Sequence, residues 1–305
     1  MSWQMQLQVT LQRPEDDAEA GRMSRAWFAG VFEAMGGRLR DALLAAGPLS
    51  AYNLRGRNME EPFGQPGEVW ATVQTKVRGT RGPRAKTDPF SEEAWDAFLG
   101  RLASPLLQSA SLRAATLDYD GFPQAFPVLD IVAEVNEAAP EWMFLSVRFS
   151  PDWLDDPRYQ KSTLAFARSF ADDWNPAYGE ISYDRGSRRT AFENVFHGDS
   201  PETAVTSREV LRGYGWLTLC PQEIGDRLGG LEALRNSGVF AEAEALTRGG
   251  YWLLATEDYR DFGQDVAERM FPVLAPALRP GDAFPDIASN PPFYVSRRNA
   301  AELQG

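Results

Sequence analysis

The stretch that most constrains the fold is the apolar run Tyr214–Cys220, which is followed directly by Pro221. Its apolar side chains occupy both alternating faces: Tyr214, Trp216 and Cys220 on one, Leu217 and Leu219 on the other. A strand that is apolar on both faces is typical of the middle of a sheet, where other layers cover it. Proline is favoured at the first position of a helix, so we expect a helix to begin directly after this strand.

The first 120 residues alternate between strand-like and helix-like patterns. Residues 3–11 alternate apolar and polar side chains, which predicts a half-buried antiparallel strand with its glutamines facing solvent. A helical repeat follows over residues 14–46, weakened at Gly36 and Gly37, and Ser91 caps a second helix. With short strands near 51–54 and 69–77, and another at 112–120, the order is β-α-β-β-α-β. That order is typical of a ferredoxin-like, split βαβ fold.

The second half repeats the α+β theme without a residue-by-residue repeat. A helix ends near Asn175-Pro176, and two strands are expected on either side of Gly249-Gly250 as a hairpin. The expected fold class is therefore α+β, with two ferredoxin-like halves whose antiparallel sheets carry helices on one face. We place the domains at 1–138 and 139–279, and treat residues 280–305 as a partly ordered tail.

Composition limits the compartment and the partners. The formal net charge is -12, which disfavours binding to phosphate backbones, so no nucleic-acid partner is expected. A single cysteine, Cys220, cannot form an internal disulfide and favours a reducing compartment. The first residues lack the pattern of a signal peptide, and no apolar run approaches the roughly 18 residues of a membrane span. We expect a cytoplasmic protein without a membrane partner.

Motifs for catalysis and cofactor binding are missing from the sequence. The one histidine, His197, lies in a predicted loop near Asp199 and Ser200, and no G-x-S-x-G elbow accompanies them. Zinc sites built on several cysteines or histidines are excluded by composition, although an all-oxygen site for Mg²⁺ or Ca²⁺ is not. Neither G-x-G-x-x-G nor a P-loop occurs. We therefore assign no catalytic residue, no metal ligand and no cofactor.

Charged clusters are the remaining candidates for a functional surface. The acidic ones are Asp152, Asp155 and Asp156; Asp172 and Asp173; Asp118 and Asp120; and Glu257, Asp258 and Asp261. The basic one is the Gly- and Pro-rich loop 78–87, with Arg78, Arg81, Arg84 and Lys86. Paired carboxylates can perform acid–base chemistry, but on an acidic protein they more often form a solvated face. As partner-binding residues we select Asp152, Asp155, Asp156, Asp172, Asp173, Arg78, Arg81, Arg84 and Lys86.

Four short motifs in the C-terminal half resemble a known family. They are Gly213-Tyr214-Gly215-Trp216-Leu217-Thr218; Arg227-Leu228-Gly229-Gly230 with Leu234-Arg235; Gly249-Gly250-Tyr251-Trp252-Leu253; and Val273-Leu274-Ala275-Pro276-Ala277-Leu278. This stretch is similar to the TsiV-like family of type VI secretion immunity proteins and to related uncharacterised actinobacterial proteins. The resemblance implies a non-catalytic cytoplasmic protein that binds and neutralises a toxin. It supplies no catalytic residues.

Three functions remain as hypotheses. The first is an immunity-type protein whose partner is a cognate toxin or effector, and an acidic inhibitor would suit a basic one. The second is a hydrolase that uses carboxylates with or without a divalent metal. The third is a small-molecule-binding α+β protein. The oligomeric state stays open at this level.

Overall fold

The computed structural model describes residues 4–46, 62–124, 129–184, 188–196, 198–284 and 293–304. They form two compact units, which we call the N-terminal unit (Arg13–Ser150) and the C-terminal unit (Trp3–Gln12 with Pro151–Gly305). Both units are mixed α+β, and the described strand pairs within each unit are antiparallel. The expected α+β class is confirmed.

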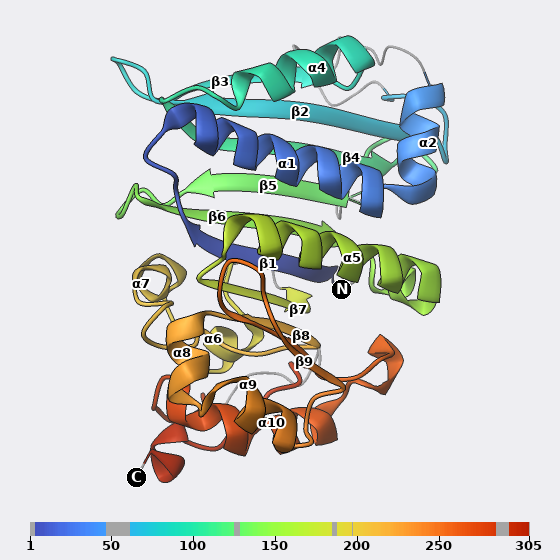
Figure 1. The fold of residues 1–305 in the computed structure, drawn as a ribbon. Coiled ribbons are helices and arrows are strands. Elements are labelled where there is room, and N and C mark those ends of the chain that lie inside the picture. Colours follow the sequence, from blue (N-terminus) through green and yellow to red (C-terminus); the bar gives the residue numbers. More distant parts are fainter. Residues whose placement is uncertain are drawn as a thin grey trace. The chain divides into compact units, whose positions relative to one another are not determined.

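The N-terminal unit is an antiparallel sheet with helices on one face. Its strands are β2 (Val69–Val77), β3 (Arg84–Pro89), β4 (Leu107–Thr116), β5 (Leu129–Val135) and β6 (Trp142–Phe149), and its helices are α1 (Asp17–Met35), α2 (Gly37–Ala45) and α4 (Glu92–Arg101). The strands follow the order β3-β2-β4-β5-β6. In Figure 1, α1 and α4 lie in front of these strands. Contacts of α2 and α4 with β2, and of α1 with β5, place all three helices on the sheet.

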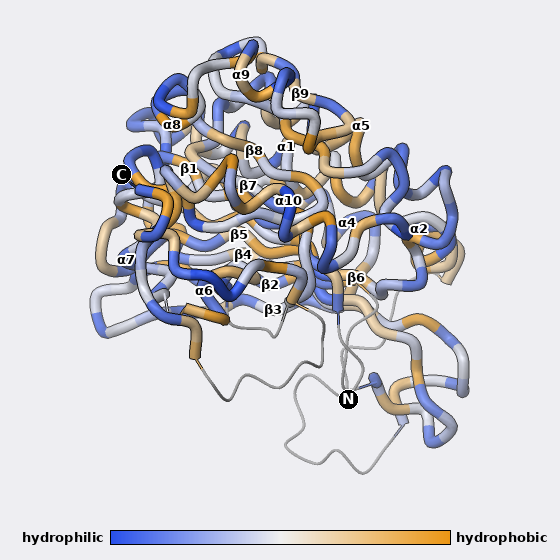
Figure 2. The backbone as a smooth tube through the Cα atoms, turned by 90° about the horizontal axis from the view of Figure 1, so that it is seen from below, coloured by the Kyte–Doolittle hydropathy of each residue, from blue (hydrophilic) through white to orange (hydrophobic). Residues whose placement is uncertain are grey.

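The register of the strands places apolar side chains of the N-terminal unit side by side in its core. Val73, Leu112, Ile131 and Val147 are successive partners across four strands, and all are fully buried. On the helices, the buried side chains include Trp27, Phe28 and Phe98. Because side chains alternate along a strand, the neighbouring positions form the opposite face, where Gln74, Ser111 and Arg148 are partly exposed. In Figure 2, hydrophobic and hydrophilic stretches follow one another along the backbone.

The helix expected over residues 14–46 is two helices. Gly37 has a φ of 48°, a left-handed conformation that glycine adopts without strain. This residue separates α1 from α2. Asp16 caps α1 by accepting a hydrogen bond from the Ala18 N–H at 3.0 Å, and Ser91 caps α4 through the Ala94 N–H at 3.1 Å. The cap at Ser91 was expected from the sequence. The strand expected at 51–54 lies outside the described residues.

The C-terminal unit has its own antiparallel strands in the order β1-β7-β8-β10-β9. They are β1 (Gln4–Gln12), β7 (Tyr178–Asp184), β8 (Leu217–Cys220), β9 (Glu242–Ala245) and β10 (Tyr251–Leu254). The helices are α5 (Pro157–Trp174), α6 (Ala191–Phe196), α7 (Ser200–Val205), α8 (Gln222–Arg227), α9 (Gly230–Asn236) and α10 (Gln264–Leu274), with short 3-10 turns η1 (Pro151–Asp155), η2 (Tyr259–Asp261), η3 (Ala275–Ala277) and η4 (Ala300–Leu303).

Two expectations for this unit are confirmed. β8 lies between β7 and β10 and is buried along its whole length, as its two apolar faces predicted. β9 and β10 pair as the hairpin expected around Gly249-Gly250, both of which have positive φ. Near the end of the chain, the Ser296 N–H donates to the Tyr214 hydroxyl at 2.7 Å, which attaches the last described segment to the segment before β8.

The first strand was only partly predicted. β1 is antiparallel to β7, as expected, but its predicted solvent face is wrong because Gln6, Gln8 and Thr10 are at most 4% exposed. Gln8 and Thr10 belong to a buried polar network, so their polarity reflects internal partners rather than water. Periodicity alone cannot distinguish these two environments.

The predicted arrangement of halves differs from the structure. A ferredoxin-like N-terminal half would place its first strand between the strands at 69–77 and 112–120, whereas β2 and β4 pair directly with each other. β4, β5 and β6 instead form a meander, so two ferredoxin-like halves are not confirmed. β6 also lies in the N-terminal unit, which ends at Ser150 rather than at residue 138. Across the described residues, no helix is long and apolar enough to cross a membrane.

Candidate functional site

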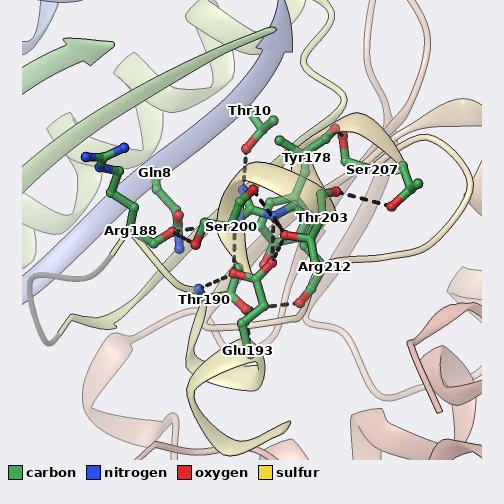
Figure 3. A network of polar contacts seen from close by, with 12 residues as sticks. Gln8, Thr10, Tyr178, Arg188, Thr190, Glu193, Ser200, Thr203, Ser207 and Arg212 are labelled. Carbon is green, nitrogen blue, oxygen red and sulfur yellow. Dashed lines mark hydrogen bonds and ion pairs between the residues drawn. The ribbon is translucent and has the colours of Figure 1, made fainter. Parts of the chain in front are cut away.

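A buried network of charged and hydroxyl side chains lies in the C-terminal unit (Figure 3). Its members come from β1, β7, the helices α6 and α7, and the segment that precedes β8. The charged ones are Glu180, Glu193 and Arg212, each at most 3% exposed. Buried charges are costly unless they are paired and hydrogen-bonded, and clusters of buried charges are frequent at functional sites. This cluster is therefore a candidate functional site.

Arg212 and Glu193 form a two-pronged ion pair. Arg212 Nε donates to Glu193 Oε1 at 2.8 Å, and Arg212 Nη2 donates to Glu193 Oε2 at 2.8 Å. The third nitrogen, Nη1, donates to the Thr10 hydroxyl on β1. The guanidinium therefore connects β1 to α6. Its two bonds to Glu193 have the two-pronged geometry in which a planar guanidinium binds a carboxylate.

The carboxylate of Glu193 also caps its own helix. The Thr190 hydroxyl accepts from the Glu193 N–H at 2.9 Å, and Glu193 Oε2 accepts from the Thr190 N–H at 2.8 Å. This is the reciprocal capping box of a Thr-x-x-Glu sequence. The Thr203 hydroxyl on α7 also donates to Glu193 Oε1, so one side chain connects α6, α7 and Arg212.

Glu180 is the second buried carboxylate of the network. Its Oε1 accepts hydrogen bonds from Gln8 Nε2 at 2.8 Å, the Ser182 hydroxyl at 2.6 Å and the Ala191 N–H at 3.2 Å. Its Oε2 accepts from the Tyr178 hydroxyl at 2.7 Å. Burial raises the pKa of Glu180 above its ordinary value, while these donors oppose that shift. All four partners are donors, which is the environment that an ionised carboxylate needs.

Arg212 offsets the charge of both carboxylates. Burial alone would lower the pKa of Arg212, but Glu193 outweighs it and the pKa is raised. The guanidinium also lies over the Tyr178 ring, 5.5 Å from its centroid, within reach of a cation–π interaction. Burial, followed by the charge of Glu180, raises the pKa of Tyr178 well above its ordinary value. These groups stabilise one another, and the arrangement fixes the packing of β1, β7, α6 and α7.

A cavity adjoins the network. It has a volume of about 230 Å³ and is lined by Phe192, Glu193, Phe196, Gly198, Glu202, Thr203, Thr206, Val210, Leu211, Arg212 and Arg279. Phe192 and Phe196 stack with their centroids 4.3 Å apart and form an apolar wall. Arg279 at the cavity is exposed to solvent. The cavity is therefore mostly apolar, with a solvent-facing cation and the buried ion pair beside it.

The structure separates the acidic residues that were selected from the sequence. Asp152 and Asp155 lie in η1, and Asp156 caps α5 by accepting from the Arg158 N–H at 2.9 Å. Asp172 and Asp173 lie at the other end of α5, which has 18 residues and so spans about 27 Å. The two groups do not form one site.

Asp172 has a structural partner of its own. It accepts from the Thr247 N–H at 2.6 Å and pairs with Arg168 at 3.2 Å. Burial raises the pKa of Asp172, but the hydrogen bond from Thr247 and the interaction with Arg168 together lower it by more. The pKa of Asp172 therefore lies below its ordinary value. Asp172 thus connects α5 to the β9–β10 turn.

The basic residues lie together on one hairpin of the N-terminal unit. Arg78 and Arg81 follow β2, while Arg84 and Lys86 lie in β3, where a loop had been expected. All four side chains are exposed. Lys86 lies 3.5 Å from Asp88, which also pairs with Arg101 of α4 at 3.1 Å.

The other candidates have structural roles or lie outside the described residues. Asp118 stabilises a turn by accepting from the N–H groups of Asp120 and Phe122. Asp258 caps η2 and accepts from Gln160 Nε2 at 3.0 Å. Cys220 is buried, and burial raises the pKa of its thiol. His197 is outside the described residues. Within the part of the chain that is described, no three metal-binding side chains cluster.

Sequence reasoning missed the residues of the network. Glu180 and Arg212 belong to no sequence motif, and their partners on β1, Gln8 and Thr10, are 172 and 202 residues away. The Thr190-x-x-Glu193 spacing is a local signal that the sequence does contain, because it is a capping-box sequence at the start of α6.

The chain is similar in fold to a known protein of a secretion system. Its structure aligns with the Pseudomonas aeruginosa T6SS protein PA0821 at a TM-score of 0.53 and 12% identity, covering 99% of this chain and 81% of that one. The sequence matches no protein-family model and no curated protein. At this identity the likeness establishes a shared fold.

Proposed function

We propose that this chain is a cytoplasmic immunity-type protein, related to the TsiV-like family, that binds a cognate toxin or effector and neutralises it without catalysis. The observation that carries the proposal is the fold likeness to a T6SS protein over 99% of the chain. The motifs between Gly213 and Leu278 support it, because they resemble the TsiV-like immunity proteins and contribute structural elements rather than a reactive group.

The buried network is consistent with this role. Glu193 is shared between a helix cap and an ion pair, and Glu180 is surrounded by four donors, so both carboxylates already have internal partners. An inhibitor needs a rigid scaffold on which to present a surface, and such a network supplies rigidity. Binding would then use exposed charges rather than these side chains.

Two exposed sets are the proposed contact residues. One comprises the acidic clusters at the two ends of α5, in which Asp152, Asp155 and Asp173 are exposed and Asp156 and Asp172 are partly exposed. The other is the basic hairpin of Arg78, Arg81, Arg84 and Lys86, all exposed. The net charge of -12 would speed association with a basic toxin, because opposite charges steer the encounter.

Co-expression with the product of the neighbouring gene tests the proposal. We expect that product to be toxic alone, to lose toxicity when this chain is present, and to co-purify with it as a stable complex. A hydrolytically inactive toxin variant measured by calorimetry would give the affinity directly. Toxicity that is unchanged by this chain, together with no detectable complex, would reject the proposal.

The cavity beside the network favours a second candidate function, the binding of a small molecule. Its aromatic wall and the exposed Arg279 suit a ligand with an apolar body and a negative group. Native mass spectrometry of the purified protein would detect a bound molecule. An Arg279→Ala variant with the same ligand occupancy would reject recognition by that cation.

A further inference from the structure

Among the described strands, β3 pairs only with β2 and β9 pairs only with β10, and each stands at an end of the strand order. An edge strand presents unpaired N–H and C=O groups to which another strand can add. The two edges differ in how these groups are treated.

The edge of β9 is closed by arginine side chains. Arg235 Nε donates to the Ala243 carbonyl at 2.8 Å, and Arg168 Nη2 donates to the Ala245 carbonyl at 3.0 Å. These carbonyls are the acceptors that an added strand would use. The guanidinium groups therefore protect β9 against strand addition.

The edge of β3 has the opposite character. The Phe90 N–H donates to the Ala71 carbonyl at 2.9 Å, which sets the phase of the ladder. With Thr75 opposite Lys86, the even-numbered residues of β3 exchange hydrogen bonds with β2. The backbone groups of Ala85, Thr87 and Pro89 then point outward. Proline, which has no N–H, is tolerated at an outward position of this kind.

No described residue closes this edge. Within the described ranges, no hydrogen bond reaches the outward backbone groups of Ala85 or Thr87, and both residues are exposed. The Thr87 hydroxyl instead accepts from Gln74 Nε2 on β2 at 2.7 Å, within the hairpin. The outward amides and carbonyls of β3 are thus available to solvent.

The positive charge beside β3 favours a negatively charged partner. Arg78, Arg81 and Arg84 are exposed and have no ion-pair partner among the described residues, although the chain as a whole carries -12. Salt screens distant charges beyond about 8 Å at physiological ionic strength. A segment that reaches β3 therefore meets the local arginines rather than the overall negative charge.

We propose that β3 is a docking edge for an extended acidic segment of a protein partner, which adds to the sheet as a further strand. The outward N–H and C=O groups of Ala85 and Thr87 pair with the segment, and the three arginines select its carboxylates. This inference rests on the proposed function, since it gives the toxin-binding role a specific surface and a specific partner chemistry.

A proline substitution tests the edge directly. Thr87→Pro removes an outward N–H but none of the backbone hydrogen bonds to β2. Thr87→Ala is the matched control, because it also loses the hydroxyl contact with Gln74 but keeps the N–H. The probe is a capped, fluorescent peptide that alternates glutamate with threonine, and its lysine counterpart is the charge control. We expect Thr87→Pro to weaken binding about tenfold and Thr87→Ala about twofold or less. Ala85→Pro gives a second edge variant should Thr87→Pro not fold.

Hydrogen exchange of residues 78–90 supplies the second readout. We expect the acidic peptide to slow exchange of the Ala85 and Thr87 amides, and Arg81→Glu with Arg84→Glu to abolish that protection. Equal binding of both peptides, or equal binding by the proline and alanine variants, overturns the inference. A concentration-dependent dimer that Thr87→Pro abolishes would assign the edge to a second copy, and overturns it too.

The outcomes separate this inference from the proposed function. A Thr87→Pro variant that still binds and neutralises the neighbouring gene product leaves the function standing and removes β3 as the docking edge. Binding of the acidic peptide at β3, without any neutralisation, leaves the edge standing and removes the immunity role.

Discussion

Arg212 and Glu193 meet through two parallel hydrogen bonds of 2.8 Å each, with both side chains at most 3% exposed. Removing one partner of such a pair leaves an uncompensated buried charge. The consequences of this geometry, and of three other contacts, can be measured.

Arg212→Met is expected to destabilise the protein by about 3–5 kcal/mol, because Glu193 and Glu180 would lose their cation. Urea unfolding followed by fluorescence would measure the free energy of unfolding. Arg208→Met is the control, since the Arg208–Glu223 pair at 3.2 Å is partly exposed and should contribute about 1 kcal/mol or less. Equal effects of the two substitutions would contradict the structural role of Arg212.

The capping hydroxyl of Thr190 gives a second prediction. Thr190→Val keeps the shape but removes the acceptor for the Glu193 N–H and the donor to the Arg212 carbonyl, 3.0 Å away. We expect a loss of about 1–3 kcal/mol in the free energy of unfolding. Thr190→Ser keeps the hydroxyl and should retain most of the stability. A valine variant as stable as the serine variant would refute the capping role.

Gly225 is held against the ring of Tyr251. A Cβ at this position would lie 2.1 Å from Tyr251 Cδ2, closer than real contacts permit. Gly225→Ala should therefore destabilise the protein by about 1–3 kcal/mol through overpacking. Gly100 in α4 has open space around it, so Gly100→Ala should stabilise by about 0.5–1 kcal/mol. Thermal unfolding of both variants would show shifts of opposite sign, and a shift in one direction for both would contradict the packing.

The carboxylate of Asp258 is expected to make the stability of the protein sensitive to acid. The hydrogen bonds from Arg260, and then that from Gln160, lower the pKa of Asp258 well below its ordinary value. A lowered pKa contributes stability that is present above the unfolded value, near 3.8, and is lost as pH falls through the folded value. Asp258→Asn should thus lower stability at pH 7 and match the wild type more closely as pH falls below 4. A stability difference that is constant from pH 7 to pH 2 would argue against it.

Helices and strands could be predicted from the sequence more readily than the long-range contacts of their side chains. The strand at β8 and the Ser91-capped helix follow from apolar runs and a cap, which are local signals. The burial of Gln8 and Thr10 could not be predicted locally, because an alternating polar face has the same pattern whether water or Glu180 and Arg212 lies beyond it. The site follows the same rule. Thr190-x-x-Glu193 is a local signal, whereas Arg212 has its strand partner 202 residues away.

That separation has a consequence for synthesis on the ribosome. Thr10 is synthesised 202 residues before Arg212, which corresponds to about 10–40 s at bacterial elongation rates of about 5–20 residues per second. Residues 13–150 have a complete sheet of their own and can fold during this interval. β7, the antiparallel partner of β1, is synthesised only after these residues. The pairing of β1 with β7 and the contact of Thr10 with Arg212 therefore form late, after residues 13–150 have left the ribosome.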